Sequence, residues 1–167
     1  LRESNIGLVV LGSGDASIQA ALQQLVADFP ERVALHFRFD ERLARRIYGG
    51  ADMMLVPSRY EPCGLVQMIA LRYGAVPLVR ATGGLRDTVK DCDLDPVDGT
   101  GFVFDTFTPQ ALRSVLSRAL AHFEDQSFWR GVQRRGMALE FSWAAAGRCY
   151  QEFYRQAIDD RSASDVD

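Results

Sequence analysis

Short apolar runs alternate with amphipathic segments along the chain, beginning with the continuous run IGLVVL at residues 6–11. That run is rich in β-branched residues and ends at glycine, which is typical of a buried parallel strand. Strands are predicted at residues 6–11, 33–39, 53–56, 75–79 and 102–104. Helices are predicted at residues 16–29, 40–47, 64–72 and 84–90, and three more follow residue 109 with breaks near 125 and 141. This alternation predicts an α/β protein with a Rossmann-like parallel sheet and helices on both faces.

The length of 167 residues corresponds to roughly one domain. We expect this domain to span residues 1–159. Residues 160–167 are small and charged, which predicts a disordered tail. The chain begins with Leu1 rather than methionine, which suggests a piece of a longer protein.

The charge balance narrows the classes of partner. Nineteen basic and 22 acidic residues give a net charge of −3, and Lys90 is the single lysine. Such a chain lacks the electrostatic footprint of a protein that binds nucleic acid or an anionic membrane. Its apolar runs are strand-length pieces, too short to cross a bilayer. We therefore expect neither nucleic acid nor membrane as a partner.

The three cysteines, Cys63, Cys92 and Cys149, are widely spaced and form no C-x-x-C pair. An odd number without such pairing predicts neither a disulfide framework nor a zinc ribbon, and reduced thiols indicate the cytoplasm. His36 and His122, the two histidines, stand far apart in the sequence. We therefore expect no metal site, and no cofactor is predicted.

Ligands of open parallel sheets bind outside the carboxyl ends of the strands, where three loops of this chain carry suggestive residues. In the loop Thr82-Gly83-Gly84, which precedes a predicted helix, two glycines let backbone N–H groups point outward. Such a loop can hold phosphate at the helix N-terminus without lysine. The alternative is a tight turn that needs glycine for its geometry alone.

A second loop, residues 57–64, carries Glu61 between a strand and a helix. A carboxylate there can accept hydrogen bonds from sugar hydroxyls or act as an acid or base. The alternative is a solvated glutamate that caps Gly64 and Leu65. Cys63 has no histidine near it in sequence, so its backbone N–H is a better candidate for the site than its thiol is as a nucleophile.

The third loop, Gly12-Ser13-Gly14, resembles the beginning of a dinucleotide fingerprint. Ser17 replaces the third glycine, and Asp15 would face a pyrophosphate with like charge, so we interpret the loop as the glycine-rich turn of a related nucleotide fold. Plain turn geometry is the alternative. Phe39, at the end of the second predicted strand, either stacks on a nucleobase or belongs to the core.

Two longer segments extend these motifs: PSRYEPCGLVQM at residues 57–68 and RYGAVPLVRATGGLRDTV at residues 72–89. Together they resemble the nucleotide-sugar half of bacterial glycogen synthases and plant starch synthases. These are retaining glucosyltransferases with two Rossmann-like domains, the GT-B architecture. The similarity includes GFVF at residues 101–104 and MALEFSW at residues 137–143, where the ending LEFSW looks more bacterial than plant.

The resemblance implies a donor-binding domain for ADP-glucose, in a parent enzyme that transfers glucose with retention to the non-reducing end of an α-1,4-glucan. It places Glu61 at the catalytic centre, binding glucose hydroxyls rather than attacking the anomeric carbon. The other binding residues that it implies are Cys63 and Gly64 beside the sugar, Thr82, Gly83 and Gly84 at the distal phosphate, Phe39 near the adenine, and Gly12 and Gly14 at the nucleotide end.

Two departures from the family pattern change this expectation. A second glutamate, which often binds the ribose eight residues after the first, is replaced by Ile69. The arginine and lysine with which the family grips the diphosphate belong to an earlier strand–loop–helix that does not occur in this sequence. We therefore expect the chain alone to lack transferase activity and to bind ADP weakly at best. The alternatives are a dinucleotide-binding oxidoreductase domain, based on Gly12-Ser13-Gly14, and a non-catalytic module that binds glucan or nucleotide.

Overall fold

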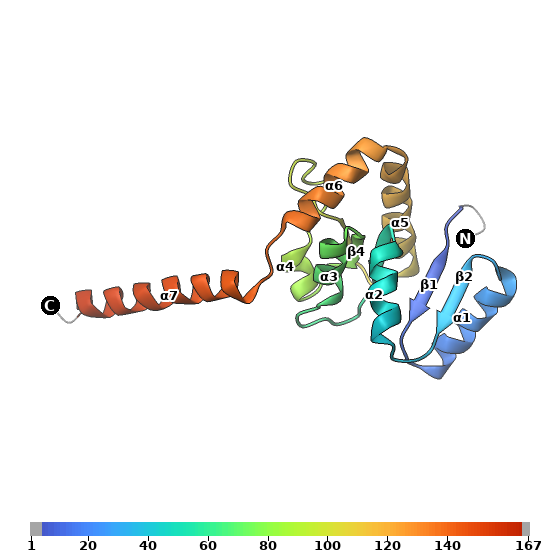
Figure 1. Cartoon of the computed structure of the whole chain (residues 1–167), viewed down its shortest axis with the longest axis horizontal. Helices are drawn as coiled ribbons and strands as arrows, with labels where there is room; N and C mark the ends of the chain where they lie inside the picture. Colours follow the sequence, from blue (N-terminus) through green and yellow to red (C-terminus); the bar gives the residue numbers. More distant parts are fainter. Residues whose placement is uncertain (1–4, 165–167) are drawn as a thin grey trace. The chain divides into compact units, whose positions relative to one another are not determined.

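A computed structural model describes residues 5–164, with side chains through residue 161 (Figure 1). The chain divides into two compact units, Leu1–Asp52 and Met53–Asp167, and each is described by itself. The described residues contain two separate sheets, one of two strands and one of three. Since the sheets share no strand, the single domain predicted for residues 1–159 stays a prediction.

The first unit holds two parallel strands and two helices. Strand β1 (Leu8–Leu11) pairs with β2 (Val33–His36) in a register that sets Leu8 opposite Val33. Helices α1 (Ala16–Asp28) and α2 (Glu41–Gly50) each follow one of these strands. Asp40 caps α2 by accepting a hydrogen bond from the Leu43 N–H, as its position before the helical segment predicts.

The second unit is built on three parallel strands in the order β3-β4-β5. The strands are β3 (Met53–Val56), β4 (Val76–Arg80) and β5 (Phe102–Phe104). The helices are α3 (Val66–Tyr73), α4 (Gly84–Thr88), α5 (Pro109–Glu124), α6 (Gln126–Ala138) and α7 (Trp143–Ser164).

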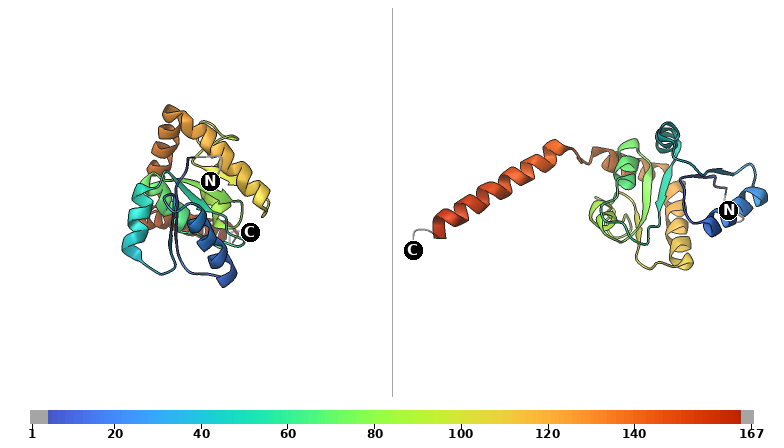
Figure 2. Two further views of the ribbon diagram at one scale, coloured as in Figure 1. Left: turned by 90° about the vertical axis from the view of Figure 1, so that its right-hand side faces the viewer. Right: turned by 90° about the horizontal axis from the view of Figure 1, so that it is seen from below.

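Side chains of β4 alternate between two cores, because successive residues of a strand point to opposite faces. Val76 and Leu78 belong to a cluster with Phe102, Val115 and Trp129, which come from β5, α5 and α6. On the other face, β4 contributes to a smaller cluster with Leu85 of α4. Helices therefore cover both faces of this sheet (Figure 2), which confirms the predicted α/β class with parallel strands.

Several element boundaries differ from prediction: β2 ends at His36 rather than at residue 39, and α2 continues to Gly50 rather than ending at residue 47. Helix α4 ends at Thr88 rather than at residue 90, and α3 begins at Val66 rather than at residue 64. In the structure, residues 160–164 of the segment predicted to be a disordered tail continue helix α7. The small and charged residues there include alanine and arginine, which favour helix, and the segment extends an existing helix without nucleating a new one. The rest of the predicted tail lies outside the described residues.

Candidate functional site

Two of the three predicted loops meet at the carboxyl edge of the sheet in the second unit. Residues 57–64 follow β3, residues 80–84 contain the end of β4, and the two strands are parallel neighbours. The loops are joined by a backbone hydrogen bond in which Gly84 N–H donates to the Pro62 carbonyl oxygen at 3.3 Å. This places the EPCG and TGG motifs side by side, as expected for a ligand site in a parallel sheet.

Glycine at positions 83 and 84 permits this close approach. A Cβ added to Gly83 would overlap the carbonyl oxygen of Glu61, and one added to Gly84 would overlap the carbonyl oxygen of Cys63. Gly83 also has a φ of +46°, in the left-handed region that favours glycine. Close packing of the two loops therefore requires glycine at both positions. This agrees with the alternative in which the glycines serve the geometry of a tight turn.

Glu61 is half-buried at this edge and keeps free acceptor capacity. The Ser58 hydroxyl donates to Glu61 Oε2 at 3.2 Å. Among the described residues, neither Gly64 nor Leu65 donates its N–H to the Glu61 carboxylate, so the capping alternative has no support in this geometry. A carboxylate can accept about four hydrogen bonds, and three of these sites remain open to a ligand.

Three backbone N–H groups of the two loops are open to a ligand. Within the described part of the chain, the N–H groups of Cys63, Gly64 and Gly83 have no acceptor, whereas the N–H of Gly84 is engaged with Pro62. Gly64 is buried, and a buried N–H group is nearly always paired, whereas Cys63 and Gly83 are exposed and accessible to a ligand. Such donors are suited to an anionic or polyhydroxyl ligand. Helix α4 has five residues, so the donors of the loop matter here more than a helix dipole.

Arg80, at the end of β4, holds the loop of Glu61 from the other side. Its guanidinium donates to the carbonyl oxygens of Ser58, at 2.7 Å, and of Arg59, and also reaches the Asp105 carbonyl oxygen at 3.4 Å. Arg80 lies inside a loop that the sequence singled out, but nothing in the motif indicated that its side chain serves the neighbouring loop. The one signal in the sequence that could have indicated this role is a lone arginine at the carboxyl end of a buried strand.

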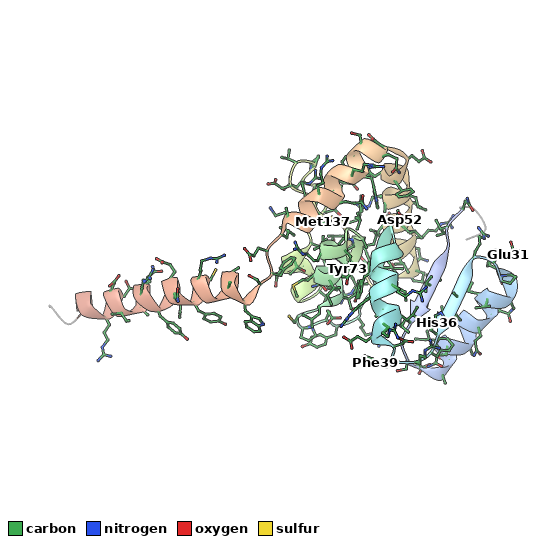
Figure 3. The ribbon with its side chains drawn as sticks, in the orientation of Figure 1. Glu31, His36, Phe39, Asp52, Tyr73 and Met137 are labelled. Carbon is green, nitrogen blue, oxygen red and sulfur yellow. The ribbon has the colours of Figure 1, made fainter. Side chains whose placement is uncertain are left out.

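The remaining candidates belong to the first unit. Gly12 follows β1 and donates its N–H to the His36 carbonyl oxygen at 3.1 Å. Phe39 follows β2 and is 94% exposed, so it is not a core residue (Figure 3). Gly14 has no atom within 4 Å of an added Cβ. The participation of Gly12, Gly14 and Phe39 in a site with Glu61 stays a prediction.

Asp15 occupies the N-terminus of helix α1. Its carboxylate accepts hydrogen bonds from the N–H groups of Ser17, at 2.8 Å, and Ile18, at 3.3 Å, and from the Ser17 hydroxyl. The Ser17 hydroxyl and these two N–H groups lower the pKa of Asp15, so the carboxylate is ionised at neutral pH. The donors that a dinucleotide pyrophosphate would need at this helix are already taken, which argues against the oxidoreductase alternative.

The thiols and histidines do not form a nucleophile–base pair in the described residues. Cys63 and Cys149 are exposed and Cys92 is buried. His122 is engaged through Nε2 with Asp93 Oδ1 at 2.7 Å. Burial raises the pKa of the Cys92 thiol to about 11. None of the cysteines is therefore placed as an activated nucleophile.

Cysteine reactivity gives a direct check on this arrangement. In the folded chain at pH 8, we expect Cys63 and Cys149 to react rapidly with an aromatic disulfide reagent and Cys92 to react at least a hundredfold more slowly, because the thiolate is the reactive form and Cys92 is buried. Unfolding in guanidinium should make all three react together. The variant Cys92→Ala should leave the fast phase unchanged, and a fast phase of three thiols in the folded chain would contradict the structure.

Other kinds of site are not found in the described residues. They contain no group of three or more His, Cys, Asp or Glu that could hold a metal ion. Their helices are too short or too polar to cross a membrane. A depression of about 460 Å³, open to solvent, is lined by residues such as Gln23, Val26 and His36, and by none of the candidate residues.

Loops at the carboxyl ends of parallel strands, such as the two that carry Glu61 and Gly83, are where α/β proteins bind their ligands. The sequence pattern of the family described as "Glycosyl transferases group 1" matches residues 1–129. The chain belongs to this family of glycosyltransferases.

Individual relatives agree with this assignment. The chain is 46% identical over 165 residues to a glycogen synthase of Moorella thermoacetica, covering 98% of this chain and 34% of the relative. It is 51% identical over 151 residues to a glycogen synthase of Anaeromyxobacter dehalogenans, covering 90% of this chain and 31% of the relative. The chain thus spans about one third of the length of the curated relatives it matches.

A solved structure agrees in fold. The catalytic domain of starch synthase IV from Arabidopsis thaliana, bound to ADP and acarbose, superposes with a TM-score of 0.78 and 36% identity. The match covers 92% of this chain and 32% of that one. The resemblance to glycogen and starch synthases, stated from the EPCGL and TGGL motifs, is confirmed.

Proposed function

We propose that this chain binds ADP-glucose as the donor-binding part of a glucosyltransferase of the glycogen synthase type. Two relatives named glycogen synthase are 46% and 51% identical to it over 165 and 151 aligned residues, and the starch synthase with the same fold was solved with ADP bound. The parent enzyme would transfer glucose, with retention, to the non-reducing end of an α-1,4-glucan in the bacterial cytoplasm.

One observation carries the proposal: the loops of Glu61 and Gly83 are held together backbone to backbone, with open donors beside an open carboxylate. Glu61 would accept hydrogen bonds from glucose hydroxyls, and the N–H groups of Cys63 and Gly64 would face the sugar. Gly83 N–H, with Thr82, would take the distal phosphate. Gly84 would act mainly through close packing, since its own N–H is engaged with Pro62.

The same donors suit the chemistry of transfer. The bond between the anomeric carbon and the phosphate oxygen breaks, and the leaving nucleoside diphosphate keeps the electron pair. A glucan hydroxyl oxygen forms the new bond to that carbon, and its proton passes to the departing diphosphate oxygen. Because negative charge grows on the diphosphate, loop N–H groups held in place beside it would stabilise the transition state without reorganisation.

A binding titration tests this assignment. We expect ADP-glucose to shift the backbone amide resonances of residues 61–64 and 82–85 in the NMR spectrum of the purified chain. The variant Glu61→Gln should weaken ADP-glucose binding about tenfold, since hydrogen bonds to a charged group contribute about 1.5–3 kcal/mol, and should leave ADP binding unchanged. Glu124→Gln, an exposed position at the end of α5, is the matched control.

Two outcomes would overturn the proposal. Tight binding of NAD without any response to ADP-glucose would favour the oxidoreductase alternative. Equal loss of ADP and ADP-glucose binding in Glu61→Gln would remove Glu61 from the sugar site. In a parallel assay with glycogen as acceptor, we expect the isolated chain to transfer no glucose, because the family's diphosphate-gripping arginine and lysine do not occur in its sequence.

A further inference from the structure

Gln67 is a fully buried amide at the base of both loops. It lies on α3 with 0% of its surface exposed, beside the buried apolar residues Ala70 and Leu71. Polar side chains are seldom buried this completely unless their hydrogen bonds are needed. Gln67 is the second residue of α3, immediately after the loop that carries Glu61.

The amide nitrogen of Gln67 connects the two loops. Nε2 donates to the Gly64 carbonyl oxygen at 2.9 Å, and lies 3.4 Å from the Cys63 carbonyl oxygen. It also donates to Thr88 Oγ1 at 3.0 Å, and Thr88 Oγ1 in turn donates to the Gly84 carbonyl oxygen at 2.6 Å. One chain of hydrogen bonds therefore runs from the EPCG loop through Gln67 and Thr88 to the first residue of α4.

The amide oxygen of Gln67 is destabilising where it lies. Gln67 Oε1 is buried and has no hydrogen-bond partner among the described residues, and an added Cβ at Gly64 would lie 2.6 Å from it. A buried acceptor without a donor costs about 1–3 kcal/mol. An apolar side chain of similar length would avoid that cost, so the advantage of glutamine here lies in what its nitrogen holds.

We propose that Gln67, acting through Thr88, is a positioning residue that sets the spacing between the sugar-facing and phosphate-facing loops. The inference rests on the proposed donor function of these loops. Removing the amide lets the loops separate, which moves the N–H groups of Gly64 and Gly83 away from a common ligand. The predicted signature is a loss of donor binding that is larger than the loss of stability.

Variants at both ends of the chain of hydrogen bonds test this. Gln67→Met keeps the length of the side chain and removes its donors, and Thr88→Val keeps the shape of threonine and removes its hydroxyl. Thr88→Ser keeps the hydroxyl and is the conservative rescue. The reporter is hydrogen exchange at the Gly84 N–H, which crosses between the loops to Pro62.

We expect exchange at Gly84 to accelerate about tenfold in Gln67→Met and Thr88→Val and to stay near the wild-type rate in Thr88→Ser. Binding of ADP-glucose should weaken three- to tenfold in the first two variants, while their thermal midpoints change little. Unchanged exchange in Gln67→Met overturns the inference. Accelerated exchange with unchanged ADP-glucose binding also overturns it, because Gln67 would then be a structural residue alone.

Failure of the proposed ADP-glucose binding can be told apart from failure of the role proposed for Gln67. If the wild-type chain does not respond to ADP-glucose, the proposed function fails, and the positioning role toward a donor fails with it. The exchange rates still decide whether Gln67 and Thr88 couple the loops. If Gln67→Met unfolds the chain, Thr88→Val and Thr88→Ser carry the comparison, since Thr88 is only half-buried.

Discussion

Gly83→Ala is expected to destabilise the second unit by about 3 kcal/mol and to abolish ADP-glucose binding. The added methyl group would overlap the carbonyl oxygen of Glu61 and would force alanine into a left-handed backbone conformation. Overpacking and backbone strain each contribute about 1–3 kcal/mol. The new Cβ is fixed to the backbone of residue 83 and meets backbone atoms of Glu61 and Pro62, so no side-chain rotation can relieve the clash.

Thermal unfolding measures this effect, and a loss of 3 kcal/mol corresponds to a fall of about 6–12 °C in Tm for a chain of this size. The control is Gly131→Ala in helix α6, where the nearest atom to the new Cβ is the flexible end of Arg135 at 3.4 Å. Alanine in a helix interior is about 1 kcal/mol better than glycine, so this variant should be as stable as wild type or slightly more. Equal behaviour of Gly83→Ala and Gly131→Ala would show that the two loops are not in contact.

Arg118→Met is expected to destabilise the second unit by about 2–4 kcal/mol. Arg118 pairs with Asp91, whose side chain is 5% exposed, at 3.3 Å, and it also donates to the Val103 carbonyl oxygen at 2.7 Å. Removing the arginine leaves a buried carboxylate without its counter-charge, which costs about 3–5 kcal/mol when both groups are fully buried. We expect a smaller loss because a third of the Arg118 side chain is exposed.

Urea unfolding at neutral pH measures this loss, with Arg134→Met on the exposed face of α6 as the control for removing a positive charge. Arg118→Lys should recover part of the stability, because lysine restores the charge and lacks the fork that reaches both Asp91 and Val103. The ion pair would have no structural importance if Arg118→Met and Arg134→Met unfolded at the same urea concentration.

Local signals account for most of the element order. The strand at residues 53–56 is predicted at its observed bounds because four apolar residues stand between a charged residue and Pro57. The N-cap of Asp40 acts within three residues of itself. In contrast, helix α7 continues into a stretch whose composition predicts disorder, since composition says nothing about an existing helix that the stretch can extend.

In the two loops, too, some features follow from local sequence and others do not. The sequence alone singled out Glu61, Cys63 and the pair Gly83-Gly84 as candidates, because the ends of strands and glycine motifs can be recognised from local sequence. It did not identify Gln67 or Arg80 as residues that join loops, because each acts on atoms about twenty residues away in the chain. A helical glutamine has the same periodicity whether it faces solvent or the base of a site.

What the sequence determined by itself is therefore the α/β class, the order of the strands and helices, the glycosyltransferase motifs and the acidic charge balance. Those depend on local propensity, periodicity and composition. Only the tertiary structure decided why both glycines are required, which backbone donors remain open and which buried side chains join the loops. These depend on contacts between segments distant in the chain, which form only when the sheet assembles. Gly84 meets Pro62 at the carboxyl edge of the sheet, whereas Arg118 meets Asp91 beside the amino end of β5.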